Sequence, residues 1–121
     1  MREFQSLEFW KKSHSLTLEI YDMTSKNFPK NELFGLTSQI RRAAASIPTN
    51  IAEGCGRRTK TDFAHFIQIA VGSASEVEYE LILAKDLNYI DENTWKKLSN
   101  DITEIRKMMY SFIQKLTAHN S

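Results

Sequence analysis

The sequence contains a single cysteine, Cys55. One cysteine cannot form an internal disulfide or a CxxC site, so a disulfide scaffold and a dithiol redox centre are both excluded. A free cysteine commonly behaves as a small, buried hydrophobic residue. We expect Cys55 to be such a residue near a helix end rather than a reactive thiol.

Long hydrophobic runs are also missing. No stretch approaches the roughly 20 apolar residues that a membrane-spanning helix needs. The first residues, MREFQSLEFWKK, alternate charged and apolar side chains, unlike a secretory signal peptide. We therefore expect a cytoplasmic protein with no membrane partner. At 121 residues, of which 41% are hydrophobic, the chain has the length of one domain, and we predict a single domain over residues 1–121.

The motifs of common enzymes and cofactor sites are absent as well. Gly54-Cys55-Gly56 lacks the context of a phosphate-binding loop, and no serine lies in a GxSxG turn. His14, His65 and His119 have no metal-ligand spacing, and only Asp62-Phe-Ala-His65 approaches half of a di-metal motif. We predict no catalytic residue, no metal site, no cofactor and no enzymatic activity.

Apolar residues recur at steps of three and four through four segments, which is the pattern of amphipathic helices. We predict helices at about residues 7–28, 32–54, 60–88 and 92–118. Pro29 should end the first helix, while Thr59 and Asp91 should cap the third and the fourth. Because the connections are short, the fold class we predict is all-α, an antiparallel up-and-down four-helix bundle.

The second segment carries a polar stripe beside its apolar one. The apolar positions are Leu33, Leu36, Ile40, Ala44, Ile47 and Ile51. The polar stripe consists of Gln39, Arg42, Ser46, Asn50 and Glu53 and contains no lysine, although a solvated helix face commonly mixes lysine with glutamate. A buried interface and a curved surface helix fit this pattern equally well.

Pro48 interrupts the same segment. A proline inside a helix removes the hydrogen bond to the carbonyl of Ala44 and costs about 3 kcal/mol unless the geometry is compensated. We expect Ser46, Thr49 or Asn50 to compensate it.

Charge is distributed unevenly, although the net charge is only +1. Residues 41–60 carry a net charge of +4, and residues 76–104 carry −5. Such a separation suits a polyanionic partner or self-association. Glu76 and Glu80 lie one turn apart and could act as paired acids, but we expect them to pair with arginines of the second helix. The basic residues of the first range are Arg41, Arg42, Arg57, Arg58 and Lys60.

Several stretches of the chain resemble one bacterial family. They are ELFGLTSQIRRAA at residues 32–44, SIPTNIAEG at residues 46–54, GSA at residues 72–74 and LNYI at residues 87–90. These stretches resemble the four-helix-bundle family of 23S rRNA-intervening sequence proteins, also called S23 proteins. The likeness extends from about Leu7 into the fourth helix, which matches in pattern rather than in motif.

The resemblance implies a bundle that assembles as a ring of five subunits. It also implies kinship with the accessory variability determinant of diversity-generating retroelements, which binds nucleic acid and a reverse transcriptase and is far more basic than this chain. On this basis, we expect nucleic acid to contact Arg41, Arg57, Arg58 and Lys60. We expect the subunit interface to contain Gln39, Arg42, Ser46, Pro48, Asn50, Glu53 and Glu76.

Two functions remain open at this stage. The first is an oligomeric scaffold that binds structured RNA or another nucleic acid through its basic rim. The second is a scaffold for a protein partner, in which the arginines are used in pairs between subunits with Glu76, Glu78 and Glu80.

Overall fold

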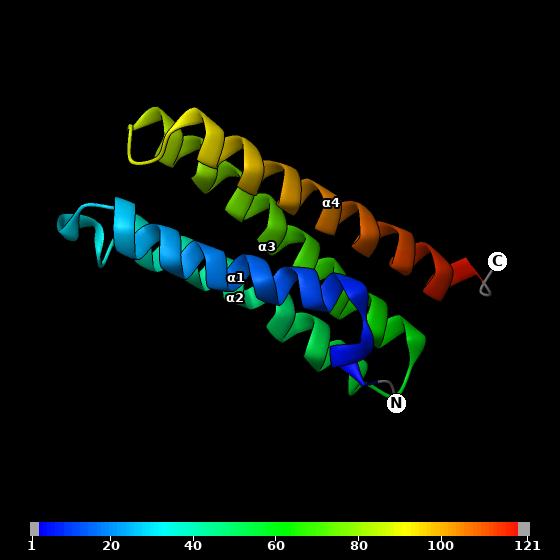
Figure 1. The fold of residues 1–121 in the computed structure, drawn as a ribbon. Helices are drawn as coiled ribbons and strands as arrows, with labels where there is room; N and C mark the ends of the chain where they lie inside the picture. Colours follow the sequence, from blue (N-terminus) through cyan, green and yellow to red (C-terminus); the bar gives the residue numbers. More distant parts are fainter. Residues whose placement is uncertain (1–2, 119–121) are drawn as a thin grey trace.

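The computed structural model describes residues 3–118 of the chain. Over this range the chain forms four α-helices, α1 (Glu8–Asn27), α2 (Leu36–Cys55), α3 (Lys60–Asp86) and α4 (Glu92–Thr117). Short 3₁₀ turns at Phe4–Ser6 and Lys30–Glu32 precede α1 and α2. The helices run alternately up and down in one bundle (Figure 1). The predicted all-α, up-and-down architecture is therefore confirmed.

The core consists of the apolar positions that the spacing identified. In α3 the apolar residues spaced by three and four are all buried, and Ile47 of α2 and Ile102 of α4 are completely buried; the α3 residues are Phe63, Ile67, Ala70, Ala74, Val77, Leu81 and Ala84. Burying a leucine, isoleucine, valine or phenylalanine side chain stabilises the fold by about 1.5–3 kcal/mol, whereas the alanines of α3 allow its neighbours to approach closely. Leu33 is an exception: 51% of it is exposed, because it lies outside α2.

Three of the predicted helix ends are confirmed. Thr59 caps α3 by accepting a hydrogen bond from the Asp62 backbone N–H at 3.1 Å, and Asp91 caps α4 by accepting one from the Thr94 N–H at 2.7 Å. The backbone becomes extended at Phe28, directly before Pro29, so α1 ends at Asn27. These ends depend on local chemistry alone, which is why the sequence predicts them.

The start of α2 differs from the prediction, since the helix begins at Leu36 rather than near residue 32. Gly35 has a non-helical backbone (φ −112°, ψ −116°) and separates the preceding turn from the helix. The Glu32 carboxylate instead accepts the Leu36 N–H at 3.0 Å, and its other oxygen accepts the Tyr89 hydroxyl at 2.8 Å. Glu32 thus caps α2 from outside and joins it to the α3–α4 connection.

The end of α3 also comes earlier than predicted, at Asp86 instead of residue 88. Asn88 adopts a left-handed backbone with φ 64°. Its N–H bonds to the Lys85 carbonyl, and the Tyr89 N–H bonds to the Ala84 carbonyl, each at 2.9 Å. This pair of bonds is a Schellman motif, in which asparagine takes the place usually held by glycine.

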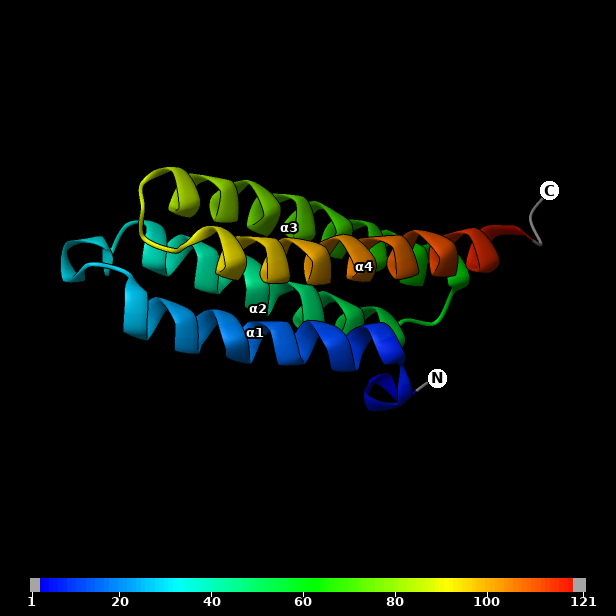
Figure 2. The ribbon, with the colours of Figure 1, turned by 45° about the horizontal axis from the view of Figure 1, so that its top comes forward.

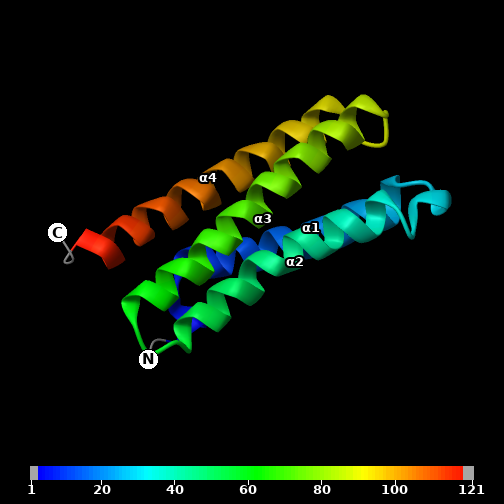
Figure 3. The same cartoon turned by 180° about the vertical axis from the view of Figure 1, so that it is seen from behind.

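The alternating directions place the α2–α3 connection, the start of α1 and the end of α4 at the same end of the bundle (Figure 2). We call this the α2–α3 end. The opposite end holds the α1–α2 and α3–α4 connections. Seen from behind, α2 and α3 lie side by side along their length (Figure 3).

Candidate nucleic-acid interface

Pro48 is buried within α2, and the helix continues through it. Its ring removes the N–H that would bond to the carbonyl of Ala44. That carbonyl is reached instead from α1, where the hydroxyl of Thr17 lies 3.1 Å from it and 2.8 Å from the carbonyl of Ser13. Because a hydroxyl has one hydrogen, Thr17 shares it between the two carbonyls, and the proline is compensated in part by this contact between α1 and α2.

The compensation expected within α2 is not observed. Thr49 donates to the Ala45 carbonyl at 2.8 Å, and Asn50 donates to the Ser46 carbonyl at 2.8 Å. Each side chain reaches the carbonyl four residues before its own position, so neither is directed at Ala44. The prediction that Ser46, Thr49 or Asn50 replaces the lost bond is wrong, because Thr49 and Asn50 bond to the carbonyls of Ala45 and Ser46, and the Ser46 hydroxyl bonds to Ser73 of α3.

The polar stripe of α2 divides into a packed centre and exposed ends. At the centre, Ser46 and Ser73 of α3 share a hydrogen bond of 2.9 Å, and the Asn50 amide donates to the Ser46 hydroxyl at 2.9 Å. Gln39, Arg42 and Glu53 are exposed. The centre of the stripe therefore joins α2 to α3 within one subunit, while its ends remain on the surface.

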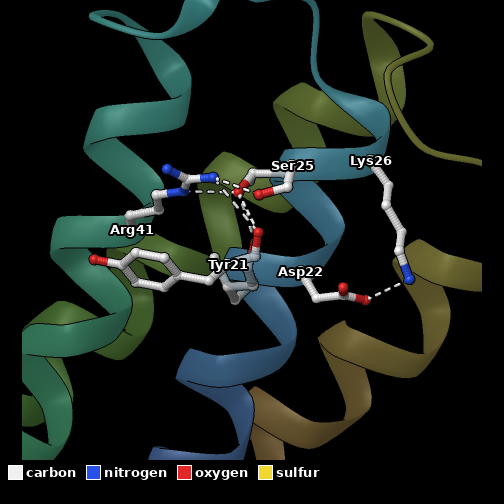
Figure 4. Close-up of polar contacts among 7 residues, drawn as sticks. Tyr21, Asp22, Ser25, Lys26 and Arg41 are labelled. Carbon is white, nitrogen blue, oxygen red and sulfur yellow. Dashed lines mark hydrogen bonds and ion pairs between the residues drawn. The ribbon is translucent and has the colours of Figure 1, made fainter.

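Arg41 is directed toward α1 (Figure 4). Its Nε donates to the Thr24 hydroxyl at 2.8 Å, and its Nη2 lies 3.0 Å from the Ser25 hydroxyl and 3.5 Å from the Tyr21 carbonyl. The guanidinium also lies over the Tyr21 ring, 4.8 Å from the ring centre. These contacts make Arg41 a link between α1 and α2.

Arg41 also lies far from the other predicted nucleic-acid residues. It is near the start of α2, and about 21 Å of helix separates it from Cys55, at 1.5 Å per residue. Arg57, Arg58 and Lys60 follow that end of the helix. The structure therefore brings these three residues together and places Arg41 elsewhere.

Arg57, Arg58 and Lys60 are exposed at the α2–α3 end, and we call them the basic turn. Arg57 forms an ion pair of 3.3 Å with Glu53 and lies over the Phe66 ring, 4.5 Å from its centre. Within residues 3–118, no ion pair or hydrogen bond engages the side chains of Arg58 and Lys60. Their charges face solvent and remain available to a ligand.

The end of α4 adds further cations at the same end of the bundle. Lys107 and Lys115 are exposed on its second half. They lie some 50 residues from the basic turn in the sequence, so no local pattern groups them with it. The up-and-down order of the predicted helices was the signal that could have found them, since it places the end of the fourth helix beside the second connection.

The acidic side chains of α3 do not pair with α2 as expected. Glu78 forms a two-pronged ion pair with Arg106 of α4, at 2.8 and 3.2 Å, and this contact lowers the pKa of Glu78. Glu76 is exposed, and Glu80 is 4% exposed. Within the described part of the chain, no ion pair joins Glu76 or Glu80 to an arginine of α2.

Burial destabilises the charged form of Glu80. Its Oε1 atom is buried and has no hydrogen-bond partner among residues 3–118. Burial, together with the charge of Glu76, raises the pKa of Glu80 to about 7. The side chain is therefore a mixture of neutral and ionised forms near neutral pH.

The described residues contain no cluster of three or more histidine, cysteine, aspartate or glutamate side chains that could hold a metal ion. None of the four helices combines the length and apolar character that crossing a bilayer requires.

Comparison with known proteins identifies a family. The sequence model described as 23S rRNA-intervening sequence protein matches residues 5–111. A solved structure from Bacteroides thetaiotaomicron VPI-5482, described as a protein of unknown function from the S23 ribosomal protein family, is 30% identical with a TM-score of 0.79. The similarity covers 88% of this chain and 98% of that one. No curated protein matches the sequence.

Proposed function

Since the chain belongs to the 23S rRNA-intervening sequence protein family, we propose that it is a non-enzymatic scaffold that binds RNA through its basic turn. The observation that carries this proposal is the exposure of Arg57, Arg58 and Lys60 on one short connection. Three cations within four residues form a compact site for the phosphates of a nucleic acid.

The contacts of the basic turn support this function. Arg58 and Lys60 have no ion pair to break within residues 3–118, and the Arg57–Glu53 pair is exposed on both sides. An exposed pair of this kind contributes about 0–1 kcal/mol, so a phosphate replaces the Glu53 carboxylate at little cost. Binding through such contacts depends on charge and is insensitive to base sequence.

The distribution of charge along the bundle gives further support. The acidic range 76–104 occupies the second half of α3 and the first half of α4, away from the α2–α3 end (Figure 2). The basic turn and Lys115 occupy the other end, and Lys107 lies between, near the middle of α4. A polyanion approaching this molecule is therefore attracted to the α2–α3 end and repelled from the opposite one.

Assembly as a ring of five subunits belongs to the same proposal. Gln39, Arg42, Glu53 and Glu76 are exposed along α2 and α3, where a neighbouring subunit can contact them. A ring repeats the basic turn once per subunit on one rim. A long RNA that contacts several copies then binds far more tightly than one contacting a single subunit.

A protein-interaction scaffold is the second candidate, and a separate observation favours it. Phe34 is 93% exposed and Leu33 is 51% exposed at the opposite end of the bundle from the basic turn. Neighbouring exposed apolar side chains are typical of protein contact sites. If this is the function, Phe34→Ser should abolish binding of the partner protein, and the parent protein should not bind RNA.

Charge reversal tests the proposed function. A fluorescence-anisotropy titration of a labelled structured RNA compares the parent protein with Arg57→Glu/Arg58→Glu. The matched control is Lys30→Glu/Lys96→Glu, which makes the same change in net charge at exposed lysines of the opposite end. We expect the first variant to lose binding while its oligomeric state is unchanged, and the control to bind within about threefold of the parent. Equal losses in both variants would show that net charge matters and the basic turn does not.

A further inference from the structure

A groove lined by aromatic residues lies between α1 and α2, in the half of the bundle nearer the α2–α3 end. It has a volume of about 350 Å³. We call it the aromatic groove. Its lining residues from the first part of the chain are Phe4, Trp10, His14 and Thr17, and those from α2 are Ala45, Pro48, Thr49 and Ala52.

The rings on the α1 side form a stack. Trp10 and His14 lie one helical turn apart, with their ring centres 5.1 Å apart and their planes inclined by only 11°. Phe4 packs edge-on against Trp10 at 5.1 Å and 62°, which holds the indole in place. His14 is exposed. The stack therefore ends in a flat ring that a further ring can cover.

The α2 side keeps the groove open. Ala45 and Ala52 contribute only methyl groups, and Pro48 is held beside α1 because Thr17 bonds to the Ala44 carbonyl. The Thr49 hydroxyl donates to the Ala45 carbonyl, so its lone pairs are left to accept an N–H from a ligand. The groove thus combines an aromatic platform with a hydrogen-bond acceptor.

We propose that the aromatic groove binds an unpaired base of an RNA strand whose phosphates contact the basic turn, an inference that rests on the proposed function. Aromatic side chains stack on the faces of unpaired bases and do so with little regard to base identity. Ala52 in the groove lies three residues, about 4.5 Å along the helix axis, before Cys55, the last residue of α2, and Arg57 follows two residues later in the connection to α3. One short single strand therefore spans the groove and the cations.

This arrangement selects the type of RNA. The bases of a duplex are stacked on each other and paired, so their faces cannot reach the His14 ring. A duplex contacts only the basic turn, whereas a single-stranded or looped RNA contacts the basic turn and the groove. The preferred ligand is thus single-stranded or looped RNA.

Tryptophan fluorescence tests this inference directly. The sequence contains two tryptophans, Trp10 and Trp95, so Trp95→Phe leaves Trp10 as the only indole. This protein is titrated with a ten-nucleotide single-stranded RNA that carries 2-aminopurine, and with the same sequence as a duplex. We expect the single strand to quench both Trp10 and 2-aminopurine, and the duplex to bind without quenching Trp10.

Two variants separate stacking from a structural role of the aromatic residues. His14→Ala removes the exposed ring, and Ala52→Met fills the groove while leaving every aromatic ring in place. Each should weaken binding of the single strand by about 10-fold and change duplex binding by less than about twofold. Unquenched Trp10, or parental affinity of both variants for the single strand, would overturn the inference.

The proposed function is tested separately by the same titrations. Arg57→Glu/Arg58→Glu should lose both the single strand and the duplex. If the basic turn binds both RNAs and the groove variants are without effect, the proposed function stands and the groove inference fails. If the parent protein binds neither RNA, both fail.

Discussion

The hydroxyl of Thr17 on α1 lies 3.1 Å from the carbonyl oxygen of Ala44 on α2, the acceptor that Pro48 leaves without its helical donor. The contact is buried and joins α1 to α2. Within the described chain, Pro48 is the only residue of α2 that cannot donate a helical hydrogen bond because of its type. It gives the Ala44 carbonyl a donor where the helix provides none, and it joins α1 to α2 beside the proline.

The first prediction follows from this contact. Thr17→Val keeps the shape of the side chain but leaves the buried Ala44 carbonyl without a donor, and we expect it to lower the free energy of unfolding by about 1–3 kcal/mol. In a Pro48→Ala background, position 48 regains a backbone N–H, so the same substitution should cost less. Urea unfolding of the four proteins in this double-mutant cycle gives the coupling. Equal losses in both backgrounds would mean that Thr17 does not compensate Pro48.

Stability should also depend on pH through Glu80. The pKa of its carboxyl is about 7 in the folded protein and near 4.5 when unfolded, so the folded state binds the proton more tightly. Between these values the folded protein holds more protons, and the free energy of unfolding falls as pH rises from about 5 to 8, by up to about 3 kcal/mol.

Replacing Glu80 isolates this effect. Glu80→Gln removes the ionisable group, so its free energy of unfolding should vary less between pH 5 and pH 8 than that of the parent and should exceed it at pH 8. Glu76→Gln, at an exposed neighbour, should change the profile only slightly. Chemical denaturation at a series of pH values measures both. If the free energy of unfolding of Glu80→Gln depends on pH as steeply as that of the parent, another group is responsible for the pH dependence.

Arg41 and Arg42 are adjacent in sequence, yet we predict different roles for them. Arg41→Ala removes the donors to Thr24 and Ser25, and should lower the free energy of unfolding by about 1–2 kcal/mol. Arg42→Ala, at a position exposed in the single subunit, should stay within about 0.5 kcal/mol of the parent when both are compared at a protein concentration too low for subunits to associate. Thermal unfolding of both variants in one buffer makes the comparison. A larger loss for Arg42 would reverse the assignment.

The end of α3 offers a test of backbone conformation. Asn88 has a left-handed backbone, which glycine adopts without cost and alanine does not. Asn88→Ala should therefore lower the free energy of unfolding by about 1 kcal/mol, while Asn88→Gly should leave it nearly unchanged. Denaturant titration distinguishes the two. If alanine is tolerated as well as glycine, the connection does not depend on the Schellman motif.

The outcome of the sequence-based predictions depends on the range of the interactions involved. Thr59, Asp91 and Pro29 act within one turn of their own positions, and the structure confirms the helix ends that they predict. The start of α2 depends on Glu32, whose carboxylate also accepts a hydrogen bond from Tyr89, 57 residues away. No local pattern contains that partner, and the non-helical backbone of Gly35 was not predicted, so the helix was predicted to begin too early.

The candidate site shows the same limit. Grouping Arg41 with Arg57 by charge ignored the direction of each side chain, and successive residues of a helix point about 100° apart. Arg41 consequently faces α1, whereas Arg57 lies at the connection to α3. Trp10 and His14 were not predicted as a pair either, although aromatic residues four positions apart in a helix lie on one face.

Salt dependence tests the central claim most directly. The affinity of the parent protein for a labelled structured RNA is measured between 50 and 300 mM salt, beside Arg58→Glu. If the basic turn contacts several phosphates, the logarithm of affinity should fall against the logarithm of salt concentration with a slope of about −2 or steeper, and Arg58→Glu should make that slope shallower by about 1. Absence of binding at 50 mM salt, or an unchanged slope in Arg58→Glu, would contradict nucleic-acid binding at this turn.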